Sequence, residues 1–413
     1  MLTNQRAGMA FIFVTLLIDI LGFGLVIPVM PQLVSRLAGG GPSAGAHVYG
    51  LLLASFGLMQ FLCSPILGSL SDQFGRRPVL LLSMFFSMVD FVIMALAPSM
   101  PWLFAGRILS GITSASFTAA SAYIADVSPP DKRAQNFGMV GAAFGIGFIL
   151  GPATGGLLGG ISLRAPFWAA AALSLVNFLY GLFVLPESLA PESRRPFSRT
   201  SFNPLKGLQI LSRYRWVLAM SVSIALLALA QQSLQSTWVL YTQYRFKWTP
   251  LQNGLSLALI GLMSGVVQMG LTRTLTPRLG DRRAILLGLA FNFAGFLAFA
   301  LVTRGWMMIP VLIVWSVSGI AGPTTQSLMS RQYGSNEQGA VQGALSSLQS
   351  LMGIVAPIIA TGVFGYFTRP DVKVRLPGSP FLLGAALIAL SAIIAREALK
   401  HGTTAEAKSA VGV

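Results

Sequence analysis

The sequence predicts an all-helical membrane protein in which twelve transmembrane helices form two six-helix halves related by a parallel repeat. Three observations lead to this fold class. Of the 413 residues, 54% are hydrophobic and only 10% are charged; long apolar stretches recur from end to end; and one segment is repeated after about 204 residues. A soluble domain has about 25% charged residues, so this composition indicates that lipid is the main solvent of the chain.

The apolar stretches have the length of membrane spans. Each is about 20 residues or longer, which is enough for a helix to cross a hydrocarbon core of about 30 Å. Backbone polar groups in lipid must be satisfied internally, and strand alternation of the barrel type is absent, so helices are expected. The predicted spans lie near residues 8–35, 48–70, 78–98, 102–125, 136–160, 165–185, 216–243, 252–272, 284–303, 306–329, 340–367 and 379–399.

The charges of the loops predict the topology. Most of the 28 Lys and Arg residues fall in segments that are cytoplasmic when the N-terminus lies inside, so both termini are expected in the cytoplasm. The expected location is therefore multi-pass in the cell (inner) membrane. The longest polar segment carries several prolines and basic residues and is interpreted as a linker. The predicted domains are an N-terminal half over 1–186, a cytoplasmic linker over 187–214 and a C-terminal half over 215–413.

The two halves carry matching segments. Residues 50–59, GLLLASFGLM, and residues 254–263, GLSLALIGLM, are identical at seven of ten positions, and Gly75 matches Gly280 at nearly the same offset. Coincidence among Gly- and Leu-rich sequences is the alternative, but repeated matches at one offset favour duplication. A parallel repeat of six helices is a known route to transporters with a central site between halves.

Composition argues against several other functions. The net charge of +16 could suggest nucleic acid, but the basic residues are scattered between apolar spans, so we expect no nucleic-acid partner. Cys63 is the only cysteine, and His47 and His401 are the only histidines. An internal disulfide, a metal site and a cofactor are therefore not expected. No nucleophile–base arrangement is present, so the chain is not expected to be an enzyme.

Ionisable residues inside the predicted spans are few: Asp19, Asp90 and Arg107, with Asp126 near a cytoplasmic end. A charge at the bilayer centre costs about 2.5–3.5 kcal/mol or more, so such residues usually face a cavity or a partner. A carboxyl at this depth can take up a proton, which makes Asp90 and Asp19 candidates for proton coupling with Arg107 as charge partner. Asp90 is favoured because it lies deeper in its span. The structural alternative is a carboxylate bonded to Arg107 or to helix-end amides.

The segment after the second span is a candidate gating loop. It contains Gly68, Asp72, Gly75, Arg76 and Arg77. Glycine permits a tight turn and a close helix approach, and Asp72 can pair with Arg or accept from the amides at a helix N-terminus. The alternative is an ordinary charged loop that only sets topology.

A second motif lies inside the fifth predicted span and is rich in small residues: Gly147, Gly151, Pro152, Gly155 and Gly156. Small residues let helices pack closely, and Pro152 removes one backbone bond and permits a kink. Packing alone would also explain the pattern.

These segments resemble the major facilitator superfamily. Residues 68–77 are similar to its signature after the second helix, Gly106–Gly111 to its fourth-helix motif, and Gly147–Gly156 to the motif of its proton-coupled drug antiporters. A closer likeness, strongest in the first half, is to the tetracycline efflux proteins. The resemblance implies functional positions at Asp19, Gln60, Asp72, Arg76, Asp90 and Arg107.

The second half departs from the tetracycline efflux pattern at two positions. Where that family has a histidine in the eighth helix and an aspartate in the ninth, both tied to proton coupling, this chain has Ser264 and Asn292. Neither side chain exchanges a proton near pH 7. We expect both, together with Gln268 and Gln60, to line the substrate cavity, and the coupling to rest on the first half.

The leading hypothesis is a monomeric, proton-driven exporter of a drug or other small amphipathic solute, with tetracycline-like compounds as the first guess. Its expected partners are the small-molecule substrate, protons and the lipid bilayer, and the proton gradient is its energy source. One alternative is a proton-coupled uptake symporter for a metabolite, although few fixed charges in the second half argue against a strongly charged nutrient. The other is a non-transporting membrane receptor.

Overall fold

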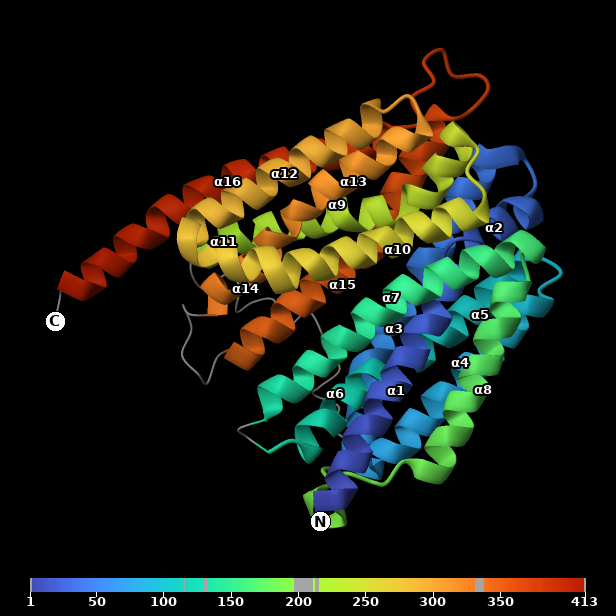
Figure 1. Cartoon of the computed structure of the whole chain (residues 1–413), viewed down its shortest axis with the longest axis vertical. Helices are drawn as coiled ribbons and strands as arrows, with labels where there is room; N and C mark the ends of the chain where they lie inside the picture. Colours follow the sequence, from blue (N-terminus) through green and yellow to red (C-terminus); the bar gives the residue numbers. More distant parts are fainter. Residues whose placement is uncertain are drawn as a thin grey trace. The chain divides into compact units, whose positions relative to one another are not determined.

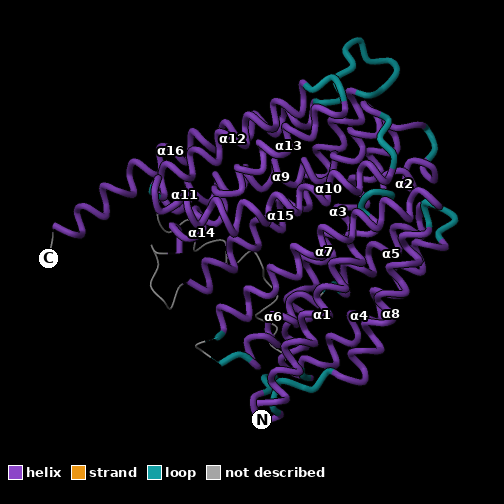
Figure 2. Tube along the Cα trace, in the orientation of Figure 1, coloured by secondary structure: helices purple, strands orange, loops and turns teal. Residues whose placement is uncertain are grey.

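The computed structural model describes residues 2–114, 116–129, 132–196, 211, 215–330 and 338–411, and all regular secondary structure in these ranges is helical (Figure 2). By their contacts the residues form two compact units (Figure 1). Unit 1 comprises Met1–Phe202 with Lys247–Leu262, and unit 2 comprises Asn203–Phe246 with Met263–Val413.

The membrane spans lie where the sequence predicts them. Within the described residues, 11 helices are long and apolar enough to cross a membrane, and a bent pair brings the number to 12. This pair, Phe11–Val26 and Met30–Ala38, meets at 45°. Pro28 lies at the bend, where it has no N–H to donate and its ring excludes a continuous helix. The expected twelve-span fold is thus confirmed, with a first span that is broken rather than straight.

Unit 1 is a helical bundle. It contains α1 (Leu2–Val26), α2 (Met30–Ala38), α3 (Gly41–Phe74), α4 (Arg76–Leu96), α5 (Met100–Thr113), α6 (Ser116–Val127), α7 (Arg133–Ile161), α8 (Ala165–Val184) and most of α10 (Pro250–Val266). The most extensive contacts join α1 to α7, α4 to α8 and α3 to α5. The ribbons of α4 and α8 run alongside each other in Figure 1.

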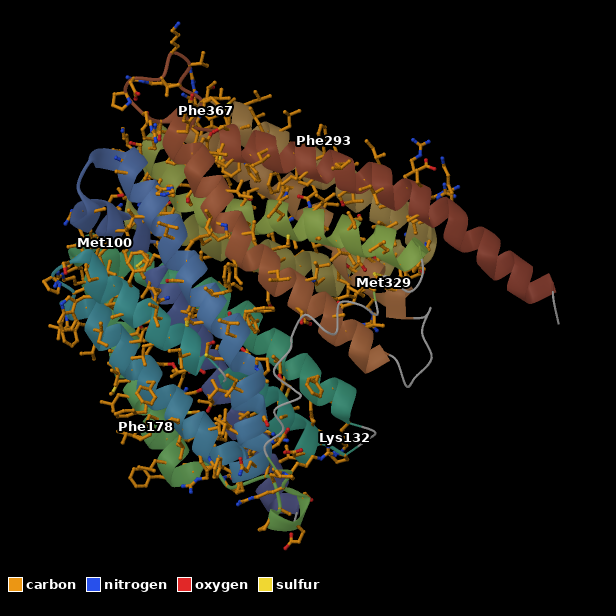
Figure 3. All side chains as sticks on the ribbon, turned by 180° about the vertical axis from the view of Figure 1, so that it is seen from behind. Met100, Lys132, Phe178, Phe293, Met329 and Phe367 are labelled. Carbon is orange, nitrogen blue, oxygen red and sulfur yellow. The ribbon has the colours of Figure 1, made fainter. Side chains whose placement is uncertain are left out.

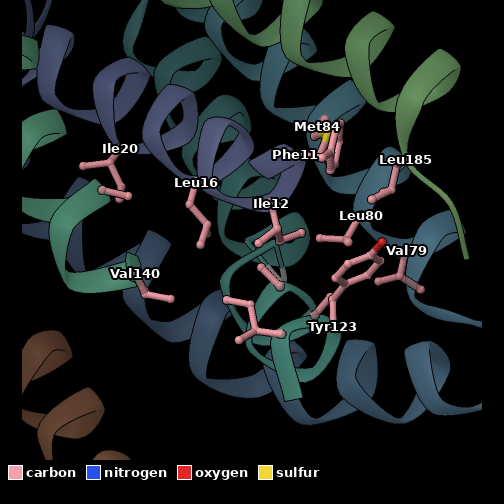
Figure 4. Close-up of a cluster of buried hydrophobic side chains, with 14 residues drawn as sticks. Phe11, Ile12, Leu16, Ile20, Val79, Leu80, Met84, Tyr123, Val140 and Leu185 are labelled. Atoms are coloured by element: carbon pink, nitrogen blue, oxygen red, sulfur yellow. The ribbon is translucent and has the colours of Figure 1, made fainter. Parts of the chain in front are cut away.

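A cluster of apolar side chains packs one end of unit 1. Ile12 of α1, Leu80 of α4 and Tyr123 of α6 are at most 1% exposed and converge in Figure 4. The Tyr123 hydroxyl donates to the carbonyl oxygen of Pro186 at 3.3 Å. The buried core is therefore bonded directly to the segment that follows α8.

Unit 2 is a second bundle. It contains α9 (Arg215–Phe246), the end of α10, a π-helical stretch (Val267–Leu271), α11 (Thr272–Leu279), α12 (Asp281–Leu301), α13 (Met308–Ser316), α14 (Ala321–Ser330), α15 (Gln338–Phe367) and α16 (Ser379–Val411). Helix α9 packs on α16 and α15. The hydroxyl oxygens of Ser223 and Ser391 lie 2.8 Å apart and join α9 to α16.

Aromatic side chains form much of the core of unit 2. The ring of Trp238 meets that of Phe299 edge-on with centroids 5.3 Å apart, and Tyr241 meets Phe381 in the same way at 4.8 Å. The Tyr241 hydroxyl also donates to the carbonyl oxygen of Phe299 at 2.9 Å. Edge-to-face packing with a satisfied hydroxyl holds α9, α12 and α16 together.

The repeat seen in the sequence appears in the local geometry of both units. Gly75 joins α3 to α4 with φ of +104°, and Gly280 joins α11 to α12 with φ of +75°. Glycine adopts this region of φ without a Cβ clash, so the same residue is needed at both turns. Pro152 and Pro357, which the same offset relates, lie inside α7 and α15.

The outward faces of the helices are apolar. Figure 3 shows side chains standing out along the helices, Phe293 of α12 among them. Large apolar residues such as Ile161 and Phe183, both 81% exposed, would face water in a soluble protein. Lipid is the solvent that suits such surfaces, in agreement with a multi-pass membrane protein.

The predicted linker over 187–214 lies largely outside the described residues; of it the structure describes 187–196 and 211. The predicted division of the chain into domains therefore stays a prediction. Contacts assign Lys247–Leu262 to unit 1, since the start of α10 packs on α7.

Candidate functional site

A buried ion pair lies within unit 1. Arg107 Nη2 donates to Asp90 Oδ2 at 2.9 Å, and the two side chains are 4% and 1% exposed. The same guanidinium contacts Met94 Sδ at 3.1 Å, and its Cζ lies 5.6 Å from the ring centre of Phe56. The structure thus brings together the two ionisable residues that the sequence singled out as proton carrier and charge partner.

Two glycines of α5 allow close packing around this pair. A Cβ added to Gly106 would lie 2.8 Å from Asp90 Oδ1, and one added to Gly111 would lie 2.6 Å from Met59 Cβ. The glycines therefore bring α5 into direct contact with α4 on one side and α3 on the other. Gln60, the predicted cavity residue of α3, is next to this contact and is partly exposed.

Asp19 occupies a different setting on α1. The Nδ2 of Asn177, a fully buried residue of α8, donates to Asp19 Oδ1 at 3.0 Å and to the carbonyl oxygen of Thr15 at 3.2 Å. One partner of this carboxylate is thus a neutral amide rather than an arginine. Asp19 itself is only partly buried.

The candidate gating loop forms a network around Arg76. Its Nε donates to Asp126 Oδ2 at 3.0 Å, and its Nη1 donates to Asp72 Oδ1 at 2.5 Å and to Ser71 Oγ at 3.1 Å. Ser188 Oγ adds a bond to the same Asp126 oxygen at 3.2 Å. The sequence allowed Asp72 to pair with an arginine or with the amides of a helix N-terminus, and in the structure it pairs with Arg76. One guanidinium therefore joins α3, α4 and α6.

A cavity of about 360 Å³ lies beside this network. It is lined by Asp72, Arg76, Asp126, Leu189, Ser193 and Arg195. Gly68, the first residue of the motif, lies on α3, where an added Cβ would meet only Thr118 of α6 at 3.9 Å. A larger side chain would therefore fit at position 68, whereas a Cβ at position 75 would meet the Glu187 carboxylate.

Glu187 is a part of this network that was not predicted from the sequence. Its Oε1 accepts from the backbone N–H of Arg76 at 2.8 Å, and its Oε2 from that of Arg77 at 3.2 Å. Helix α4 begins here without a side-chain cap from Gly75, and a Cβ on Gly75 would strike the Glu187 carboxylate. A carboxylate at a helix N-terminus satisfies free amides and complements the helix dipole. The signal was the Leu-Pro-Glu-Ser sequence directly after the sixth span.

Arginine side chains join α4 to the α8 region at both ends of α4. Arg77 Nη2 donates to the carbonyl oxygen of Leu182 in the last turn of α8 at 2.8 Å. Arg164, just before α8, donates to the carbonyl oxygens of Ala95 at 3.0 Å and Ala97 at 2.7 Å, where α4 ends. Cations at helix C-termini are favourable. Helix α4, which carries the buried aspartate, is therefore fixed to the α8 region at both ends.

The small residues of α7 form two packing faces. Gly147, Gly151 and Gly155 recur every four residues and face α1. A Cβ on Gly151 would lie 2.9 Å from Gly24 Cα, and one on Gly155 would strike the carbonyl of Leu25. Such spacing of glycines lets two backbones touch.

The second face of α7 contacts the start of α10. A Cβ on Gly254 would lie 3.0 Å from Gly156 Cα and would strike the carbonyl of Pro152. Close packing on two sides therefore explains the whole motif structurally, and its role in antiport stays a prediction.

Unit 2 contains a cavity of about 430 Å³ between α9, α12, α14 and α15. Its polar lining residues are Ser223, Gln231, Gln232, Gln235, Thr325, Gln326, Gln342, Ser346 and Gln349. None of its lining residues in the part of the chain that the structure describes is ionisable. These glutamines were not predicted from the sequence, although Gln231, Gln232 and Gln235 stand out inside an apolar span.

The three residues predicted for this half occupy different places. Asn292 is 2% exposed, and its Oδ1 accepts from Trp315 Nε1 at 2.9 Å and from Gln231 Nε2 at 3.3 Å. Asn292 therefore does not line the cavity itself, but it is hydrogen-bonded to Gln231, which does. Ser264, near the end of α10, and Gln268, exposed in the π-helical stretch, are not among the lining residues.

Comparison with known proteins identifies the family. The model of the Major Facilitator Superfamily matches residues 12–357. This chain belongs to the Major Facilitator Superfamily. It is 40% identical to the class C tetracycline resistance protein of Escherichia coli over 96% of this chain and 97% of that one. It is also 40% identical to the class G tetracycline resistance protein of Vibrio anguillarum, over 84% and 88%.

A solved transporter structure supports the fold. The human organic anion transporter MFSD10 (TETRAN) superposes with a TM-score of 0.70 and 25% identity, covering 95% of this chain and 99% of that one. The expected resemblance and twelve-helix fold are confirmed. The chain is a superfamily transporter that is embedded in the membrane and acts on a small molecule, not an enzyme.

Proposed function

We propose that this transporter exports a drug-like solute in exchange for protons, and that tetracycline-like compounds are its first substrate class. Support comes from relatives that are named tetracycline resistance proteins and align over nearly the whole chain. The glycine motif of α7, typical of drug antiporters by resemblance, agrees with this direction of transport.

The observation that carries the proposal is the buried pair of Asp90 and Arg107, with 2.9 Å between Nη2 and Oδ2. An ionised Asp90 is stabilised by this guanidinium. A proton on Asp90 removes the negative charge, so the contact between α4 and α5 weakens and Arg107 becomes available to another acceptor. Protonation would therefore shift the balance between two conformations, which is what coupling needs. Asp19 is the second candidate, since its amide partner can bond either form of a carboxyl.

The network around Arg76 is proposed as the gate. Opening would break the bond between Arg76 and Asp126, which joins α4 to α6 at 3.0 Å. Glu187 would keep the start of α4 in place while that bond changes. Gly68, Gly75 and Arg77 complete the loop, and the glycines of α7 would keep α1 and α10 close during the motion.

Within unit 1, substrate contact is proposed for Gln60. Within unit 2, it is proposed for Asn292 through its hydrogen bond with the cavity residue Gln231, and for Ser264 and Gln268, which lie outside the cavity lining. None of these side chains titrates near pH 7, so substrate binding here and proton binding at Asp90 would use different groups.

The remaining parts of the proposal concern topology and assembly. Both termini would lie in the cytoplasm of a cell (inner) membrane, with halves at 1–186 and 215–413 joined by a linker at 187–214. The transporter would act as a monomer, without a metal or organic cofactor, and the proton gradient would supply the energy.

Flux in proteoliposomes of defined orientation tests the proposal. With an imposed pH gradient, radiolabelled tetracycline should move from the cytoplasmic side to the outside as protons move in. Movement in the same direction as the protons would indicate the uptake symporter instead. Absence of any gradient-dependent flux, with normal insertion, would contradict proton-driven export and favour a receptor.

A further inference from the structure

We infer that the face of unit 2 formed by α12 and α16 binds an anionic phospholipid, whose phosphate lies between Arg283 of α12 and Arg396 of α16. The inference goes beyond the proposed function, because it holds for either direction of transport and for any solute. Two kinds of side chain recognise the ligand: arginines contact the phosphate, and apolar residues contact the acyl chains.

Helices α12 and α16 pack side by side and run in opposite directions (Figure 1). The ring of Phe381, near the start of α16, contacts those of Phe296 and Phe299 near the end of α12, with centroids 6.4 Å and 6.0 Å apart. A helix rises about 1.5 Å per residue, so Arg396 and Arg283 each lie about 23 Å from this contact along their helices. The two arginines therefore occupy the same end of unit 2 on neighbouring helices.

This end of the helix pair has a surplus of positive charge. Three exposed arginines lie here: Arg282, Arg283 and Arg396. The described parts of the two helix ends contain two acids, Asp281 and Glu397. The Glu397 carboxylate is paired with Lys400 at 2.6 Å, so it does not neutralise an arginine. The surplus favours an anion from outside the chain.

The corresponding turn of unit 1 uses its arginine differently. There Arg76 pairs with Asp72 and with Asp126, the latter at 3.0 Å. At the offset of 205 residues, Asp281 takes the position of Arg76 and Pro277 takes that of Asp72. The repeat therefore does not carry the ion pairs of the gate into unit 2, and the arginines at the start of α12 need another partner.

Exposed apolar side chains continue from the arginines along both helices. Ile393, 62% exposed, lies three residues before Arg396, so the two side chains are neighbours on α16. Phe293, 38% exposed, lies about three helical turns after Arg282 on the same face of α12. Both apolar residues belong to membrane spans that end beside the arginines. This order, cations followed by apolar surface, matches a phospholipid headgroup followed by its acyl chains.

The chemistry of arginine selects an anionic headgroup. A guanidinium is planar and always charged, and it donates two parallel N–H bonds to phosphate oxygens. Basic pockets between membrane helices bind acidic headgroups in this way. A zwitterionic lipid such as phosphatidylcholine has a cationic group that the arginines repel. Free phosphate would satisfy the arginines but would make no use of the apolar surface, so the ligand is the anionic lipid.

The test measures binding of phosphatidylglycerol to the purified full chain in neutral detergent by native mass spectrometry. The unmodified chain should bind phosphatidylglycerol more tightly than phosphatidylcholine. Arg283→Ala and Arg396→Ala should each weaken phosphatidylglycerol binding about fivefold, the effect of one basic residue near an anionic headgroup. Both side chains are exposed, so thermal unfolding without added lipid should stay unchanged and show that α12 still packs on α16.

The matched control is Arg304→Ala, the same change at an exposed arginine just beyond the other end of α12. Its affinity for phosphatidylglycerol should equal that of the unmodified chain. An equal loss in the control and in both site variants would indicate diffuse attraction and overturn the inference, as would unchanged affinity in both site variants. Displacement of the bound lipid by inorganic phosphate alone would show a phosphate site and would overturn the assignment to a lipid.

Discussion

The carboxylate of Glu187 caps the helix that begins at Arg76: Oε1 of the glutamate lies 2.8 Å from the backbone nitrogen of the arginine. The same Oε1 accepts from the backbone nitrogens of Ser188 at 3.0 Å and Leu189 at 3.1 Å. Arg76 is thus held at its backbone by one acid and at its guanidinium by Asp72 and Asp126. The segment after the sixth span therefore helps to position the proposed gate.

Removal of this cap should impair transport without preventing insertion. Glu187→Ala leaves the first amides of α4 without a partner, which costs about 1 kcal/mol and lets Arg76 shift. Flux should fall, and Glu187→Gln should be intermediate because its amide oxygen still accepts but carries no charge. Glu192→Ala, an exposed acid in the same segment, is the control and should transport normally. Equal flux in Glu187→Ala and the control would show that the cap has no role in transport.

The gate itself should depend on its charges. Arg76→Ala removes the bonds that join α3, α4 and α6, and Asp72→Asn weakens one of them, so both variants should insert normally and transport poorly. Tetracycline flux in proteoliposomes measures the effect. The exposed Arg278 of α11 provides Arg278→Ala as a control for the loss of one positive charge. Undiminished flux in Arg76→Ala would refute the gating role.

The buried ion pair should show strong coupling in stability. Arg107→Leu leaves the Asp90 carboxylate without its cation in a buried site, at a cost of about 3–5 kcal/mol. The double variant Asp90→Asn/Arg107→Leu has no orphan charge, so it should unfold at a higher temperature than Arg107→Leu alone. Thermal unfolding in detergent measures both. Additive losses in the double variant would mean that the two residues do not stabilise each other.

The glycines of α7 should tolerate substitution according to their contacts. A Cβ on Gly151 would lie 2.9 Å from the backbone of α1, so Gly151→Leu should force the helices apart and cost about 1–3 kcal/mol. Gly160 has open space around it, and Gly160→Ala should leave stability unchanged or raise it slightly. Thermal unfolding of the purified variants compares them. Equal unfolding temperatures would contradict close packing of α1 and α7.

Hydropathy located the spans because a helix that crosses lipid must be long and largely uncharged. This property can be seen in a single continuous stretch of the sequence. It also exposed Asp90 and Arg107, since a charge inside such a helix is rare and needs a partner. The bend at Pro28 was not expected, because length alone does not distinguish one bent span from a straight one.

Two parts of the candidate site were missed for physical reasons. Glutamine carries no charge, so Gln231 and Gln235 did not count among the costly residues of the span, and their convergence with α15 depends on tertiary packing. Glu187 lies outside the spans, where an acid is ordinary; the Leu-Pro-Glu-Ser sequence marks its position, but its role appears only in the contact with the start of α4. Hydropathy is a property of one segment, whereas contacts between helices depend on the tertiary fold and could not be predicted from a single segment.

The most direct test of the central claim is uphill transport of tetracycline into everted vesicles under an imposed pH gradient, with Asp90→Asn compared to the unmodified chain. Because the proposed coupling needs a group at position 90 that gains and loses a proton, Asp90→Asn should abolish uphill accumulation while downhill exchange of substrate persists. Asp19→Asn, measured in parallel, identifies the second candidate. Uphill accumulation as strong as in the unmodified chain, in both Asp90→Asn and Asp19→Asn, would contradict proton coupling through these residues.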